Sequence, residues 1–201
     1  MRSPNPELEQ KIRKECLALL LQKEGELIGM RDIASACGVS PTSIYYYFKD
    51  KEELFEAVKL DCIKMMDDFI RIHSASFIDP AFRFRAGLRA FRDWAFGNPR
   101  IAVLIMGRLK ANLSLEGASY APYYVSTDNA KALLDQAVAE GKAKSTDTRM
   151  DSSLCIAAVW GAIESILLNR TAPEYWGAGI EFTDRMIELC CSAFLIFRGE
   201  Q

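Results

Sequence analysis

The residues best able to do chemistry are six cysteines and one histidine, residue types that form metal sites and nucleophile–base pairs. The cysteines stand at positions 16, 37, 62, 155, 190 and 191 without a Cys-x-x-Cys pair, and His73 is the only histidine. The chain also lacks Gly-x-Ser-x-Gly, Walker, Rossmann and His-Glu-x-x-His patterns. We therefore expect free, buried thiols, and we expect no metal, no cofactor and no catalytic residue. The competing interpretation of the chain is a helical enzyme.

A second group of residues has the chemistry to bind an anionic polymer. Short hydroxyl side chains at Thr42 and Ser43 precede three tyrosines and a lysine, and such groups donate hydrogen bonds to phosphate oxygens and base edges. Overall charge does not favour this, since the net charge is −2 and residues 1–60 hold nine Lys and Arg against ten Asp and Glu. Attraction to DNA then requires basic residues on the docking face and acidic residues elsewhere.

Helix signals place this group on a short helix. Asn5 and Pro6 begin a first helix, which we expect to end at Gly25, and a second runs from Met30 to Ala36. Gly38 permits a sharp turn. Ser40 and Pro41 then begin a third helix to Phe48, and Asp50 with Glu53 opens a fourth to His73. Two short helices around a Gly-containing turn are typical of a helix-turn-helix.

The run from Ile33 to Leu54 resembles the signature of TetR-family regulators. It reads Ile-Ala-x-x-x-Gly-Val-Ser, then an aromatic run ending in Phe48, then Lys-x-Lys-x-x-Leu. The resemblance covers about the first 60 residues, and the body resembles the family only in helix number, helix length and loop placement. It implies that the third helix enters the major groove of double-stranded DNA. The candidate DNA-binding residues are Arg31, Thr42, Ser43, Tyr45, Tyr46, Tyr47 and Lys51.

Simpler roles remain open for two of these residues, because Tyr45 can be partly packed and Lys51 can be an ordinary solvated lysine. The linker from Gly25 to Met30 is about one residue shorter than the usual family linker and lacks its aromatic residue and its Ser or Thr cap. We therefore expect Gly29 to cap the second helix.

The expected architecture is all-α with about nine helices, divided into a helix-turn-helix domain over residues 1–50 and an effector-binding and dimerisation domain over 51–201. Body helices are expected over about 80–96, 99–113, 121–140, 147–169 and 180–197, with Asn98 and Asp147 as caps. The eighth is apolar nearly all round, which predicts burial by its own fold on one side and by a second subunit on another.

The apolar stretch from Leu154 to Leu168 carries Glu164 and is too short to span a bilayer, and the polar N-terminus lacks a secretory signal. We therefore expect a cytoplasmic protein without a membrane partner.

The family resemblance implies that the last two helices form a homodimer interface. Candidate interface residues are Ala158, Gly161, Ala162, Ile187, Cys190, Cys191, Phe194 and Phe197. A disulfide from Cys190 or Cys191 to its symmetry mate remains a possible alternative.

Large, adaptable side chains predict a pocket for an unidentified small-molecule effector, although each is also compatible with an ordinary core position. The pocket candidates are Met65, Met66, Phe69, Phe91, Trp94, Met106, Leu109, Tyr123, Tyr124 and Trp160.

Three arginines, Arg85, Arg89 and Arg92, share one face of the fifth helix and could bind an anionic ligand or form a solvated helix face.

Together these features predict a ligand-responsive transcriptional regulator, a repressor that binds a palindromic operator as a homodimer and is released by its effector. The alternative is a helical small-molecule-binding protein of the same shape that does not bind DNA.

Overall fold

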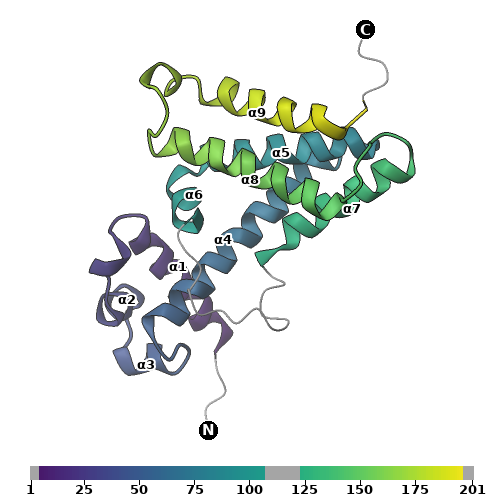
Figure 1. Ribbon diagram of the computed structural model, residues 1–201. Helices are drawn as coiled ribbons and strands as arrows, with labels where there is room; N and C mark the ends of the chain where they lie inside the picture. Colours follow the sequence, from purple (N-terminus) through teal and green to yellow (C-terminus); the bar gives the residue numbers. More distant parts are fainter. Residues whose placement is uncertain (1–4, 107–122, 197–201) are drawn as a thin grey trace. The chain divides into compact units, whose positions relative to one another are not determined.

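The computed structural model describes residues 5–106 and 123–196, and within them the chain is helical, with a single isolated β-bridge. The all-α prediction is confirmed. The helices are α1 Pro6–Leu20, α2 Met30–Cys37, α3 Pro41–Tyr45, α4 Lys51–Ser74, α5 Pro80–Gly97, α6 Pro99–Met106, α7 Val125–Ala139, α8 Thr148–Leu167 and α9 Gly179–Phe194 (Figure 1).

The described residues form two compact units that divide inside α4. Residues up to Ile63 belong to the first unit, and those from Lys64 onward belong to the second. A domain boundary between residues 50 and 51 stays a prediction.

Most helix starts follow from caps that the sequence displays. Asn5 accepts a hydrogen bond from the Glu7 amide at 3.0 Å, and Asp147 accepts one from the Met150 amide at 3.0 Å. These side chains satisfy amides that have no partner within the helix. Asn98 differs from its predicted role, because its side-chain amide donates to the Trp94 carbonyl at 2.9 Å and so closes α5.

The prediction that Gly25 ends the first helix is wrong. Helix α1 ends at Leu20, and Gly25 begins a short 3₁₀ helix, Gly25–Leu27. A Cβ at Gly25 would lie 3.0 Å from the Phe55 ring and 3.3 Å from the Leu20 side chain. Glycine here therefore avoids a tight contact with α4, a long-range effect that local sequence does not reveal.

Two other helix ends differ from the expectation. Helix α3 ends at Tyr45, three residues early, because the Tyr47 and Phe48 amides both bond to the Ile44 carbonyl and tighten the last turn. Helix α9 ends at Phe194, because Leu195 is extended and pairs with Ala143 in the β-bridge.

The core of the first unit joins α1, α2, α3 and the start of α4. Ile12, Ile33, Ile44 and Leu54 are fully buried, and each such side chain stabilises the unit by about 1.5–3 kcal/mol. An ion pair between Arg13 on α1 and Asp61 on α4, at 3.2 Å, lies at the edge of this core. The short helices are thus stabilised by packing, because three turns or fewer are marginal in isolation.

The second unit is built around α5, which contacts α6, α7, α8 and α9. Figure 1 shows α8 and α9 as antiparallel neighbours joined by a loop. Helix α8 has 20 residues and a mean hydropathy of 1.4 in its most apolar window, so by length and composition alone it could span a membrane, against the expectation from Leu154 to Leu168. Only 28% of that window is buried within the protein, and most of the remaining residues of the helix are half-buried.

Candidate nucleic-acid interface

The turn between α2 and α3 depends on Gly38. Its φ of 68° lies in the left-handed region, and nothing lies within 4 Å of a Cβ placed there. The Val39 amide bonds back to the Ala34 carbonyl at 3.0 Å, which ends α2 and redirects the chain. As predicted, Gly29 caps α2, where its amide donates to the Asp32 carboxylate at 2.8 Å.

One side of helix α3 is buried in the core and the opposite side is exposed. Ile44 and Phe48 are buried in the core, whereas Tyr45 and Tyr46 are 54% and 58% exposed. Thr42 is also exposed, on the first turn. Ser43 is half-buried, and its hydroxyl lies 2.9 Å from that of the cap Ser40, which also accepts the Ser43 amide at 3.3 Å. The helix therefore presents hydroxyl groups and aromatic rings outward from a fixed base.

Tyr47 and Lys51, which are predicted to bind DNA, form long-range contacts within the protein. The Tyr47 hydroxyl accepts a hydrogen bond from the Asn5 amide at 3.0 Å, which ties the start of α1 to the end of α3. The Lys51 ammonium donates to the Gly25 carbonyl at 3.3 Å and lies 5.5 Å from the Phe55 ring centre. Arg31 is exposed on the first turn of α2. Sequence reasoning missed both internal contacts, because they join residues 26 or more positions apart.

Many acidic side chains of the first unit act as structural partners. Asp50 accepts from the Glu53 amide at 2.7 Å, and Glu53 accepts from the Lys49 amide at 2.7 Å. Glu9 and Asp61 both pair with Arg13. These carboxylates therefore act in helix caps and ion pairs, while the expectation that acidic residues point away from the docking face stays a prediction.

The thiols of this unit are inert by position. Burial raises the pKa of Cys16 to about 12 and also raises the pKa of Cys37. Throughout the described part of the chain the cysteines are unbridged, and it contains no cluster of three metal-binding side chains.

The predicted pocket residues are scattered over the second unit, and Leu109 lies outside the described residues. Phe91 stacks on Trp160 with ring centres 5.1 Å apart, and Phe69 lines a hollow of about 260 Å³ between α4 and α5. Met66, Phe91 and Trp94 are buried, Met106, Tyr123 and Trp160 are half-buried, and Met65 and Tyr124 are exposed. A larger cleft of about 720 Å³ is lined by other residues, among them Phe96, Ile166 and Trp176.

The predicted dimer residues fall into two groups, with Phe197 outside the described residues. Ala158, Gly161 and Cys190 are not buried in this single chain, whereas Ala162, Ile187, Cys191 and Phe194 are buried within it. Leu154 on α8 and Leu189 on α9 are 58% and 54% exposed. These leucines extend the uncovered apolar surface beyond the predicted residues.

The thiol of buried Cys155 on α8 interacts with that of half-buried Cys190 on α9. Hydrogen bonding between them lowers the pKa of Cys190 and raises that of Cys155. Burial raises the pKa of the adjacent Cys191 to about 12. The pKa values of these two neighbouring cysteines are therefore shifted in opposite directions.

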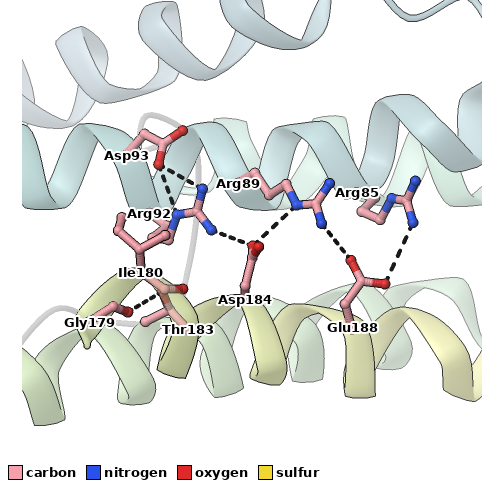
Figure 2. A network of polar contacts seen from close by, with 9 residues as sticks. All are labelled: Arg85, Arg89, Arg92, Asp93, Gly179, Ile180, Thr183, Asp184 and Glu188. Carbon is pink, nitrogen blue, oxygen red and sulfur yellow. Dashed lines mark hydrogen bonds and ion pairs between the residues drawn. The ribbon is translucent and has the colours of Figure 1, made fainter. Parts of the chain in front are cut away.

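The three arginines of α5 form ion pairs, so the picture of a simple solvated helix face is wrong. Figure 2 shows Arg85, Arg89 and Arg92 opposite Asp184 and Glu188 of α9. Arg89 bonds to Asp184 at 3.2 Å and to Glu188 at 2.9 Å. Arg92, only 7% exposed, pairs with Asp93 at 2.8 Å and with Asp184. This α5–α9 ladder was missed, although the matching spacing of acids on α9 and arginines on α5 was visible in the sequence.

The geometry of the first unit is that of a helix-turn-helix domain, with a left-handed glycine between two short helices and an exposed second helix. Residues 17–58 match the model of the bacterial regulatory proteins of the tetR family. The resemblance noted in the sequence is thus confirmed: the chain carries a tetR-family helix-turn-helix segment.

Solved structures extend the likeness to the whole chain at the level of fold. FadR from Bacillus subtilis, solved with stearoyl-CoA, is 14% identical, with 91% of this chain and 97% of that chain covered and a TM-score of 0.74. The TetR-family regulator PfmR from Thermus thermophilus is 20% identical, with coverage of 90% and 97% and a TM-score of 0.64. The superantigen PfiT is 22% identical, with coverage of 98% and 100% and a TM-score of 0.71. No curated protein matches the sequence.

Proposed function

We propose that the protein is a cytoplasmic, ligand-responsive transcriptional repressor that binds a palindromic operator as a homodimer and is released by a small-molecule effector. The observation that carries this proposal is the exposed face of α3, held by buried Ile44 inside a tetR-family segment. Its helix-turn-helix domain spans residues 1–50, and its effector-binding and dimerisation domain spans residues 51–201.

Helix α3 is the element that enters the major groove in this proposal. Thr42 and Ser43 lie on its N-terminal turn, where short hydroxyl side chains can reach base edges. Tyr45 and Tyr46 are exposed enough to donate their hydroxyls to phosphate oxygens. Arg31 supplies a charge on α2. Tyr47 and Lys51 contribute through phosphate contact and also through the internal bonds that set the shape of the domain.

The uncovered surface of α8 and α9 supports a homodimer. Leu154 on α8 and Leu189 on α9 are exposed, and α8 also carries the small residues Ala158 and Gly161, which would let two copies of this surface approach closely. In the proposed homodimer the two helix-turn-helix domains bind successive major grooves, about 34–36 Å apart. An isologous pair of this kind reads a palindrome.

Effector release requires that the ligand prefer a body conformation unsuited to DNA. A differential affinity of about 1–3 kcal/mol would loosen DNA by about 5- to 150-fold. Helix α4 is the connecting element, because its 24 residues belong in part to each unit. The stearoyl-CoA bound to FadR supports the idea that a body of this fold holds a small molecule.

The proposal is tested by selecting bound sequences from random duplex DNA and titrating the enriched duplex with the full-length protein. Tyr45→Ala is expected to weaken binding, whereas Tyr175→Ala, which removes a tyrosine of similar exposure from the second unit, should not. A palindrome whose affinity falls steeply with salt is the supporting result. Failure to enrich any sequence at low salt contradicts the repressor.

The second candidate is a small-molecule-binding protein of this shape that does not bind DNA. The excess of one acidic residue over basic residues in the first 60 positions favours it. The likeness to the superantigen PfiT also shows that the fold is not confined to proteins named as regulators. Ligand binding together with no salt-dependent affinity for any duplex would support this candidate.

A further inference from the structure

A hollow of about 260 Å³ lies beside the arginines of α5 and has an aromatic wall. Phe69 at the end of α4, Phe77 in the following loop and Phe82 on α5 provide that wall. His73 stacks on Phe69 with ring centres 3.7 Å apart, and its Nδ1 lies 2.8 Å from the Phe69 carbonyl oxygen. These contacts fix the Phe69 and His73 rings, so the aromatic wall is formed before any ligand binds.

The polar side of the hollow is formed by Arg85 and Arg89, one helical turn apart on α5. The Arg85 guanidinium also lies 5.2 Å from the Phe82 ring centre, where the aromatic and cationic sides meet. Asp93 lines the same hollow, but its carboxylate pairs with Arg92 at 2.8 Å. The two arginines are therefore the cationic groups that face the space.

One carboxylate, that of Glu188 on α9, pairs with both of these arginines (Figure 2). Its oxygens lie 3.5 Å from Arg85 and 2.9 Å from Arg89, and its side chain is 41% exposed. Asp184 is held more firmly, because the nearly buried Arg92 pairs with it as well as Arg89. Glu188 is thus the member of the ladder that can most readily turn to solvent.

We propose that this hollow binds a small aryl carboxylate, whose ring packs among the phenylalanines and whose carboxylate replaces that of Glu188 on Arg85 and Arg89. Ring and carboxylate match the two sides of the hollow, and a fork of guanidinium N–H groups binds a carboxylate in either case. The volume of about 260 Å³ lies just below the usual range of ligand sites, about 300–1,000 Å³, so the ligand is smaller than a drug-sized molecule.

Replacement of Glu188 by the ligand carboxylate would also change how α9 is held to α5. Loss of Glu188 from the ladder leaves Asp184 as its remaining carboxylate on α9, so the C-terminal half of that helix would be held to α5 by apolar contacts such as Phe194 against Phe84 and no longer by an ion pair. Helix α9 carries part of the proposed dimer surface. The inference therefore rests on the proposed function in one respect, that the body binds an effector.

The test is calorimetric titration of the full-length protein with 2-naphthoate, with neutral 2-naphthamide as the matched ligand. We expect naphthoate to bind and the amide to bind at least about tenfold more weakly, because only the acid pairs with the arginines. Arg85→Gln and Arg89→Gln should each weaken naphthoate about tenfold. Arg170→Gln, which removes an exposed ion pair with Glu164 on α8, should leave it unchanged.

Glu188→Gln gives the result that separates this mechanism from simple attraction to arginine. Because the variant removes the competing carboxylate, naphthoate should bind several-fold more tightly. Equal binding of acid and amide, no binding by the native protein, or weaker binding by Glu188→Gln would overturn the inference. Operator affinity, measured separately, distinguishes the two proposals: DNA binding without naphthoate binding overturns only the ligand site, and the reverse overturns only the repressor.

Discussion

Replacing Gly38 by alanine isolates the backbone requirement of the helix-turn-helix. The residue has a φ of 68°, and a Cβ would meet nothing within 4 Å, so no steric clash contributes to the effect. An L-residue in the left-handed region costs about 1–2 kcal/mol relative to glycine. We therefore expect Gly38→Ala to destabilise the turn by about that amount and to weaken operator binding.

Amide hydrogen exchange is the assay, because it reports on α2 and α3 locally while the second unit stays folded. A loss of about 1–2 kcal/mol predicts exchange about 5- to 30-fold faster in the α2 segment. Gly38→Asn should be milder, since asparagine tolerates this conformation.

Gly141→Ala is the matched control for this experiment. Gly141 has a φ of 69° and equally empty space around it, but it follows α7 in the second unit. Faster exchange there, with α2 and operator affinity unaffected, is expected. Unchanged exchange in α2 of Gly38→Ala would refute the argument that the left-handed conformation is what the turn requires.

Four further outcomes follow from contacts in the structure. Alkylation of Cys190 should reach half its maximal rate at a lower pH than that of an ordinary thiol, because its pKa is lowered, and Cys155→Ala should move this midpoint upward because the hydrogen bond to the thiolate is lost. Lys51→Met should destabilise the first unit by about 1 kcal/mol through loss of the Gly25 contact. It should also make the slope of log operator affinity against log salt concentration shallower by about 0.9 per subunit. An unchanged slope would mean that Lys51 contacts Gly25 and not the DNA phosphate. Arg92→Leu should lower the free energy of unfolding by about 1–3 kcal/mol in a urea titration followed by tryptophan fluorescence, whereas Arg71→Leu, which breaks an exposed pair with Asp68, should change it little. Gly161→Ala should weaken dimerisation in sedimentation equilibrium although it favours the helix, because the added methyl group faces the proposed partner; unchanged association would place the interface elsewhere.

The sequence was sufficient where local chemistry decides the structure. Caps such as Asn5, Ser40 and Asp147 begin helices in the way their side chains predict, because each bonds an amide two or three residues away. The same holds for Gly38, whose turn needs a conformation that glycine adopts without strain. Helix ends were less predictable, since the space that requires Gly25 is set by Phe55, which lies far along the chain on α4.

The same distinction between local and long-range effects applies to the residues of the candidate sites. The exposed face of α3 follows from the spacing of its buried residues, which periodicity reveals. The internal contact of Lys51 does not, because the Gly25 carbonyl becomes a partner only after the linker has folded back onto α4. The arginines of α5 show the same limit: their spacing was visible, but the carboxylate partners of Arg89 lie 95 and 99 residues further along the chain.

The short bridge between Ala143 and Leu195 secures the end of α9 to the loop after α7 with main-chain atoms. The Lys144 amide bonds to the Phe194 carbonyl, and the Ile196 amide bonds to the Lys142 carbonyl, both at 2.8 Å. The side chains of Ala143 and Leu195 are buried as well, so main-chain bonds and apolar packing both hold this end of the helix. In protein engineering, a fusion or tag is therefore best joined after Ile196, because a truncation before Leu195 would remove the bonds that hold the end of α9.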